Sequence, residues 1–146
     1  MATYSFLDVT ASLTGPTGVI DLGQGSANSE EGITQTMGGN KNTMTIGADG
    51  EVMHSLHADK SGTITLTLLK TSPVNKKLSL AYNAQSQSSA TWGNNVIVIR
   101  NTASGDISTA RSCAFQKQPD FNNAKEGGTV AWVFDCGKID QLLGEF

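Results

Sequence analysis

The sequence contains few histidines, cysteines, prolines and aromatic residues. It has two histidines, two cysteines and three prolines in 146 residues, and aromatic side chains make up 6% of it. No apolar run approaches the roughly 20 residues that a membrane-spanning helix needs. Residues 1–13 lack a basic leader followed by an apolar core, so we expect synthesis and residence in the cytoplasm.

Charge of either sign is also sparse. The formal net charge is -3, and charged residues make up 16% of the chain. A protein that binds DNA tightly usually has a strongly basic surface, because it neutralises phosphates with Lys and Arg. We therefore expect any DNA that meets this protein to do so without specific binding.

The two cysteines, Cys113 and Cys136, each lie in an alternating apolar pattern. Such positions favour reduced thiols in the core, and a disulfide between them is the alternative. Two thiols without a nearby histidine are too few for a structural zinc site.

Glycine, serine and threonine are abundant instead, which suits a turn-rich β protein. The length fits a single domain, residues 1–146, with a core of its own. Alternating apolar and polar residues predict strands over 7–13, 19–22, 33–37, 44–47, 51–57, 63–68, 96–100, 110–117 and 129–136. The segments 23–32 and 38–42 are predicted to be loops.

Two of these strands define the expected core. Their apolar faces hold Ile64, Leu66, Leu68, Val130, Trp132 and Phe134. The other face of the first strand is polar and carries Thr63, Thr65 and Thr67. A single helix should follow, with Ser72 as its N-cap and Pro73 in its first turn, ending near residues 85–89. The fold class is therefore mainly β with one α-helix, built of packed antiparallel sheets in a sandwich or barrel.

The stretch GADGEVMHSLHADKSG, residues 47–62, holds both histidines and raises the possibility of a metal-dependent hydrolase. His54 and His57 are three residues apart in a predicted strand, where an odd separation places side chains on opposite faces. They cannot then share one ion. The chain also has no GxSxG nucleophile motif and no P-loop. We predict no catalytic, cofactor-binding or metal-ligating residue, and hence no enzyme.

Several long stretches carry a resemblance. The segments YSFLDVTASLTGP, SGTITLTLLKTSPVNKKLSLAY, WGNNVIVIRNTASGD and CGKIDQLLG resemble the tail tube proteins of bacteriophages, above all those with contractile tails. The likeness covers nearly the whole chain and is weakest over 23–42. It implies packed antiparallel sheets with one helix, hexameric rings that stack into a hollow tube, and a continuous β-barrel that lines the channel. The family carries no catalytic residues.

The resemblance also implies partners and a place in the virion. These are other copies of the chain, a sheath protein, a tape-measure protein, and baseplate and tail terminator proteins. The tube would be assembled in the cytoplasm of the host and would conduct DNA during ejection. Thr63, Thr65 and Thr67 are candidates to face the lumen.

A predicted hairpin within residues 44–57 is the candidate contact between rings. Its exposed apolar side chains need a partner surface, and in the resembled family a long hairpin at this place reaches the adjacent ring. The residues concerned are Met44, Ile46, Asp49, Gly50, Val52 and Met53. Three other functions stay open: the tube of a phage-tail-like bacteriocin or type VI secretion-like apparatus, a carbohydrate-binding β-sandwich, and the metal-dependent hydrolase.

Overall fold

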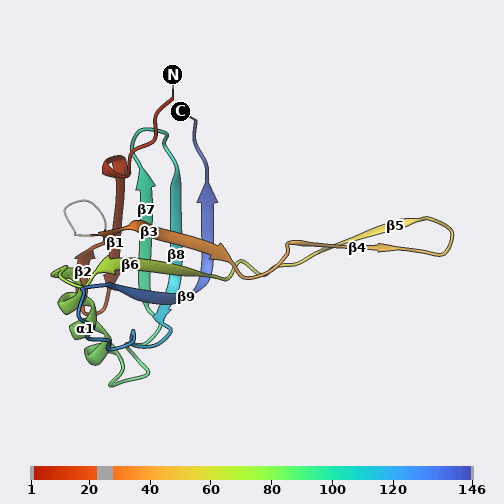
Figure 1. Ribbon diagram of the computed structural model, residues 1–146. Helices are drawn as coiled ribbons and strands as arrows, with labels where there is room; N and C mark the ends of the chain where they lie inside the picture. The colour runs from red at the N-terminus through yellow and green to blue at the C-terminus, as the bar shows by residue number, and fades with distance from the viewer. Residues whose placement is uncertain (1, 23–27, 146) are drawn as a thin grey trace.

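The computed structural model describes residues 2–22 and 28–145, and shows two separate sheets and one α-helix (Figure 1). The larger sheet has seven strands in the order β2-β1-β7-β8-β9-β6-β3, and β4 and β5 form a sheet of their own. All strand pairs are antiparallel. The strands are β1 (Val9–Gly15), β2 (Gly18–Asp21), β3 (Asn28–Met37), β4 (Asn42–Ile46), β5 (Val52–Leu56), β6 (Gly62–Leu69), β7 (Asn95–Asn101), β8 (Ile107–Phe115) and β9 (Thr129–Leu142). The helix is α1 (Val74–Gln85), and a short 3-10 helix, η1 (Phe6–Asp8), precedes β1.

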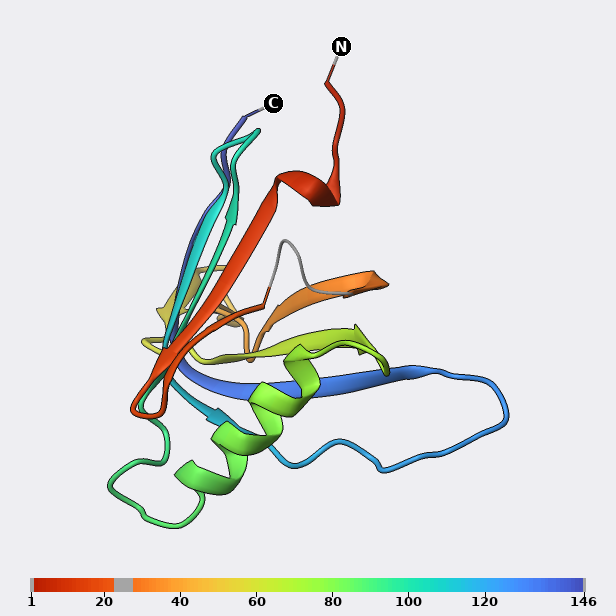
Figure 2. The same cartoon turned by 90° about the vertical axis from the view of Figure 1, so that its left-hand side faces the viewer.

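The seven-stranded sheet is folded into two arms that meet at a steep angle (Figure 2). β8 and β9 run from one arm to the other, and both change which side chains they bury at the corner. In β9, Phe134 and Cys136 are buried before the corner and Ile139 after it. Ser112 lies opposite this change in β8 and has a φ of 54°, which few residues other than glycine adopt. The corner is therefore a local kink in two paired strands.

The core lies against both arms and is shared with the helix. Ile64, Leu66, Leu68, Trp132 and Phe134 are buried, and Val130 is half-buried against them. Phe115 contacts Tyr82, Trp92, Trp132 and Phe134 through ring centroids 4.8–6.5 Å apart. The helix buries the stripe Val74, Leu78, Ala81 and Gln85, which follows the spacing of one helical face.

The start of the helix matches the pattern in the sequence. Pro73 already has helical dihedrals, and the Ser72 hydroxyl accepts a hydrogen bond from the Val74 N–H at 3.3 Å. Ser72 therefore caps the first turn, with proline in the position that needs no N–H. No helix in the described part of the chain is long and apolar enough to cross a membrane.

The mainly β fold with one helix and antiparallel sheets is confirmed, and the sheet is open rather than a closed barrel within one chain. Several element boundaries were predicted wrongly; β8, for example, begins at Ile107 and not at residue 110. Residues 28–32, predicted to be loop, begin the edge strand β3, whose pairing with β6 is irregular between Asn28 and Ile33. β9 continues past Cys136 to Leu142, and residues 7 and 8, predicted to begin a strand, belong to the 3-10 turn Phe6–Asp8. The rest of the predicted loop, residues 23–27, lies outside the described residues.

Candidate assembly site

The β4–β5 hairpin projects far from the body of the protein (Figure 1). Its tip is a tight turn in which the Gly47 N–H donates to the Glu51 carbonyl at 2.8 Å and Gly50 has a φ of 88°. The Asp49 carboxylate accepts a hydrogen bond from the Glu51 N–H at 3.1 Å. A residue with a side chain would be strained at Gly50, so the sequence Ala48-Asp49-Gly50 fixes the turn and the register of the two strands.

The base of the hairpin is held by a second side-chain turn. The Asp59 carboxylate accepts hydrogen bonds from the N–H and the hydroxyl of Ser61, at 2.8 and 2.6 Å. These two hydrogen bonds lower the pKa of Asp59, because they stabilise its charged form. The His57 N–H donates to the Lys41 carbonyl at 2.9 Å, which continues the strand pairing toward the body.

The two faces of the hairpin differ in polarity. The strand register pairs Met44 with His54, Ile46 with Val52 and Asn42 with Leu56. These three pairs lie on the same face of the hairpin, because paired residues and residues two apart in a strand point to the same side. This face therefore carries four large apolar side chains, all exposed: Met44, Ile46, Val52 and Leu56. Met53 is exposed on the other face beside Thr45. Leu56, 82% exposed, is not among the contact residues predicted from the sequence, although it follows Val52 and His54 in the alternation of β5.

The histidines lie on opposite faces of the hairpin, as predicted. His54 is hydrogen-bonded to Asn42 at 3.2 Å, and His57 to Thr43 at 2.6 Å. Asn42 and Thr43 are neighbours in β4, so their side chains point in opposite directions. Within residues 2–22 and 28–145, no group of three His, Cys, Asp or Glu side chains could hold a metal ion.

The polar face of β6 continues across its neighbours. Thr63 is opposite Thr36 of β3 and Asp135 of β9, and Thr65 is opposite Thr34 and Val133. Thr63 and Thr65 are half-buried, whereas Thr67 is only 7% exposed, which leaves little of it to face water. The result is a threonine-rich surface over β3 and β6, with Val133 and Asp135 beside it on β9.

The open edges of the large sheet are β2 and β3. Edge strands present backbone donors and acceptors that can pair with another chain, and proteins usually shield them. An open sheet, a polar face and a projecting hairpin are all features that a partner copy could complete.

Comparison with known families identifies the chain. A family model described as "Bacteriophage PhiTE tail tube protein" matches residues 1–144. The chain belongs to this tail tube family. It is thus a structural component of a phage tail tube. No curated protein sequence matches it.

Three solved structures share the fold at low sequence identity. A chain of the sheath–tube complex of an extracellular contractile injection system in the extended state has a TM-score of 0.58 and 10% identity, over 97% of this chain and 92% of that one. A chain of the sheath/tube terminator of that system gives 0.62 and 11%, over 97% and 98%. A chain of the anti-feeding prophage cap gives 0.55 and 10%, over 99% and 95%. The tail tube type of fold is therefore confirmed.

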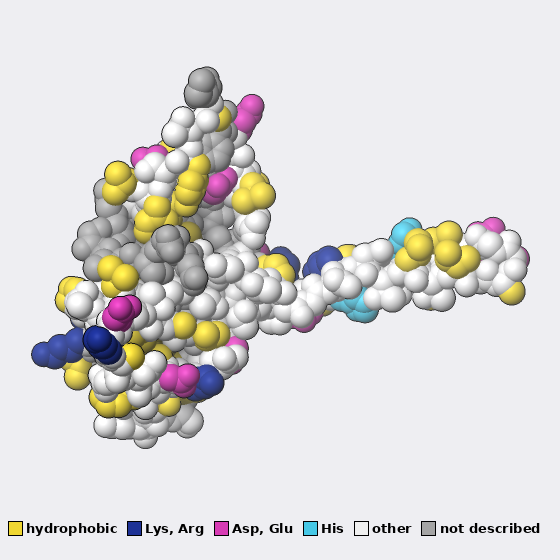
Figure 3. All heavy atoms as spheres, in the orientation of Figure 1, with side chains coloured by type: hydrophobic (Ala, Val, Ile, Leu, Met, Phe, Trp, Pro, Cys, Tyr) yellow, Lys and Arg dark blue, Asp and Glu magenta, His cyan; other side chains and the backbone are white. Residues whose placement is uncertain are grey.

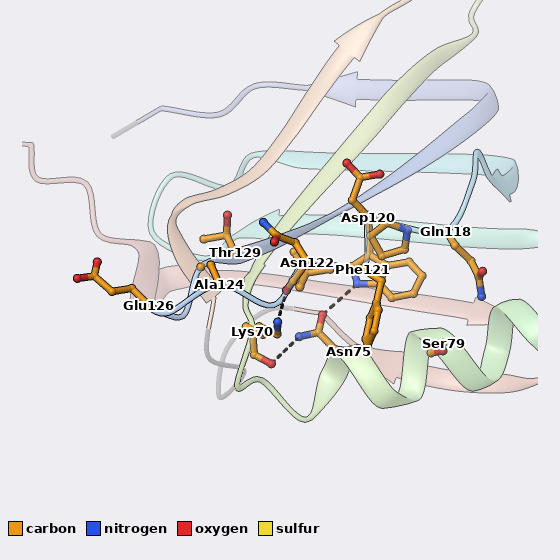
Figure 4. A pocket seen from close by; sticks show the side chains of 14 residues that line it. Lys70, Asn75, Ser79, Gln118, Asp120, Phe121, Asn122, Ala124, Glu126 and Thr129 are labelled. Carbon is orange, nitrogen blue, oxygen red and sulfur yellow. Dashed lines mark hydrogen bonds between the residues drawn. The ribbon is translucent and has the colours of Figure 1, made fainter.

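The tail tube chain also has a pocket of about 520 Å³ between α1 and the segment 116–128 (Figure 4). Some of its polar groups are hydrogen-bonded: Lys70 donates to Asn122 and to the neighbouring Asn123, and Asn75 accepts from the Trp132 indole N–H at 3.0 Å. Neither histidine nor cysteine lines it. Two carboxylates, Asp120 and Glu126, also line the pocket.

Proposed function

We propose that this tail tube chain, residues 1–146 acting as one domain, forms closed hexameric rings that stack head to tail into a hollow tube. The projecting β4–β5 hairpin is the single observation that carries the proposal. An isolated two-stranded hairpin is marginal in water, and this one exposes four apolar side chains on one face. A surface of the next ring that covers this face would stabilise it.

Closure of the ring follows from the open sheet. Six copies can join edge to edge and remove the unpaired edges of β2 and β3. In that arrangement the threonine-rich face, with Thr63 and Thr65, lines the lumen. A neutral to slightly acidic wall lets DNA slide, because a basic wall would hold phosphates through counterion release. The chain acts as a conduit and not as an enzyme.

The partners of the tube follow from the same proposal. A sheath, a terminator and a cap are named with the structures that share this fold, and we infer that sheath, terminator, baseplate and tape-measure proteins contact this tube too. Tubes assemble in the host cytoplasm and end in the virion tail. A second candidate role is the tube of a phage-tail-like injection apparatus, because the structures that share this fold come from contractile injection systems. Particles that contain both this chain and packaged DNA would support the phage tail tube, and particles with the chain but without DNA would support the injection apparatus.

The test is electron microscopy and sedimentation of the purified protein and one hairpin variant. Replacing Ile46–Met53 with a short Gly/Ser turn removes the proposed contact between rings and leaves the seven-stranded sheet untouched. A heterologous head-to-tail contact is open-ended, so its loss stops growth while closed rings persist. We expect tubes from the parent protein and isolated rings from the variant.

A pair of point variants refines the same test. Met44→Ser/Ile46→Ser/Val52→Ser changes the apolar face, while Thr43→Ser/Thr45→Ser changes the opposite face and serves as the control. Only the first should stop stacking. Tubes of parental length from the Gly/Ser variant, or a parent protein that remains a dispersed monomer, would refute the proposal.

A further inference from the structure

The exposed face of α1 carries an unusual combination of side chains. Lys76 and Lys77 are exposed in its first turn, and Leu80, 60% exposed, follows them at the spacing of helical neighbours. The helix contains no acidic residue, and neither lysine forms an ion pair among the described residues. Cations in the first turn oppose the helix dipole, so these lysines do not serve the stability of the helix.

Three of the other eight basic side chains are held by ion pairs or hydrogen bonds in the described part of the chain. Lys60 and Arg111 both pair with Asp140, at 3.4 and 3.6 Å. Lys70 donates to Asn122 and Asn123. The face of α1 made by Lys76, Lys77 and Leu80, called here the α1 patch, is therefore a basic and apolar surface without a partner in its own chain.

The tip of the hairpin has the complementary character. Asp49 and Glu51 are exposed there, and neither forms an ion pair among the described residues. Exposed Ile46, Val52 and Met53 lie directly beside them. In Figure 3, acidic side chains lie at the end of the projection and hydrophobic ones gather just behind it.

The two surfaces lie at opposite ends of the molecule. α1 is at the end of the body away from the hairpin in Figure 1, and Figure 2 shows the helix in front with the hairpin pointing to the rear. The tip of the hairpin therefore cannot reach the α1 patch of its own chain. Contact between copies stacked along the direction of the hairpin would bring the tip of one copy to the helix end of the next.

We propose that the hairpin tip, Asp49 and Glu51 with the apolar side chains beside them, docks on the α1 patch of a copy in the adjacent ring. This inference rests on the proposed stacking function and identifies the receiving surface. Lys76 and Lys77 attract the two carboxylates, and Leu80 covers part of the apolar side of the tip. Charge complementarity of this kind sets the orientation and the register of an interface more than its affinity.

Charge reversal tests the pairing from each side. Lys76→Glu/Lys77→Glu makes the α1 patch acidic and should fold normally, because acidic residues suit the first turn of a helix. Asp49→Asn/Glu51→Lys makes the tip basic and keeps an amide oxygen that can accept the turn hydrogen bond from residue 51. Each variant alone should form rings but shorten tubes about tenfold or more, because weak ion pairs repeated around a ring add up.

Mixing the two variants is the decisive measurement. Acidic tips of the first variant meet basic helices of the second, and basic tips meet acidic helices, so alternating rings should restore tubes. Tube length should also fall with added salt in the parent protein. A control with the same change of net charge away from α1, Arg100→Glu/Lys138→Glu on β7 and β9, should leave tube length unchanged.

The outcomes separate this docking from the stacking function. Full-length tubes from either charge variant alone, or no recovery on mixing, would overturn the docking while parental tubes still support stacking through the hairpin. A parent protein that forms neither rings nor tubes would overturn both. Folding is followed for every variant by its melting temperature, which should stay within a few degrees of that of the parent.

Discussion

Two fully buried amide side chains, Gln85 and Asn95, hydrogen-bond to each other in both directions. Gln85 Nε2 donates to Asn95 Oδ1 at 2.9 Å, and Asn95 Nδ2 donates to Gln85 Oε1 at 2.7 Å. Their remaining N–H groups donate to the Thr17 hydroxyl at 3.1 Å and to the Cys113 carbonyl at 3.1 Å. The pair thus connects the end of α1 to β7 and β8 with every amide hydrogen satisfied.

We predict that Gln85→Ala destabilises the protein by about 1–3 kcal/mol, because Asn95 is then left buried without its partners. The double variant Gln85→Ala/Asn95→Ala should cost less than the sum of the two single changes. Urea unfolding of the four proteins in this cycle measures the difference. Strict additivity would show that the two amides do not act together.

Gly15 packs against the same pair of amide side chains. A Cβ built on Gly15 would lie 2.0 Å from Asn95 Oδ1, an atom held in place by the amide pair. The glycine is therefore required by close approach, since its neighbour cannot move away without losing hydrogen bonds. Nothing in the local sequence LTGPTG indicates more than a turn.

The cysteines are both free and buried, and they face each other across β8 and β9. The Cys113 thiol donates to Cys136 Sγ at 3.1 Å. This hydrogen bond raises the pKa of Cys113, which would lose its donor on ionising, and lowers the pKa of Cys136, which accepts. The two cysteines are part of the buried core at the corner of the sheet.

At the scale of elements, β6 is the strand on which the core depends. It pairs with β3 on one side and β9 on the other, and Ile64, Leu66 and Leu68 are at most 1% exposed. Leu66 is opposite Trp132, whose indole N–H donates to Asn75 near the start of the helix. This row of side chains therefore connects β6, β9 and α1.

Truncating Leu66 or Trp132 to alanine should cost roughly 2–5 kcal/mol of stability, because each leaves a cavity at the centre of this row. Leu80→Ala is the matched control on an exposed position and should change stability by about 0.5 kcal/mol or less. Denaturant unfolding gives the comparison. Equal stability of all four proteins would mean that the buried face of β6 is not the core.

Over the whole molecule, the tail tube family and the projecting hairpin point to assembly, and both histidines lie on that hairpin. The histidines hydrogen-bond to neighbouring residues of β4 on opposite faces of the hairpin, so they cannot grip one ion together. Both lie outside the proposed acidic tip. His54 shares the apolar face of the hairpin with Met44 and Val52, and His57 lies on the opposite face beside Thr43.

We predict that His54→Ala/His57→Ala assembles into tubes nearly as long as those of the parent, and that the parent contains no stoichiometric metal. Electron microscopy measures the first point and elemental analysis the second. About one zinc per chain, lost together with assembly in the double variant, would instead indicate a metal-bound hairpin.

The local pattern in the sequence determined much of this protein. Alternation along residues 63–68 fixed the buried face of β6, Ser72 and Pro73 fixed the start of α1, and Asp49-Gly50 fixed the hairpin turn. These features depend on interactions within a few residues, which is why they can be predicted. The opposite placement of His54 and His57 follows from the period of a strand alone.

Contacts between distant segments decided the rest. The start of β3 at residue 28 depends on pairing with β6, some 40 residues away, and the segment itself has no strand pattern. The extension of β9 to Leu142 depends on pairing with β8, and the Gln85–Asn95 pair on where α1 meets the sheet. α1 lies in the chain between β6, on one arm of the sheet, and β7, on the other, so its position also depends on how the two arms fold against each other. No local pattern records it, because it is the sum of pairings made along the whole chain.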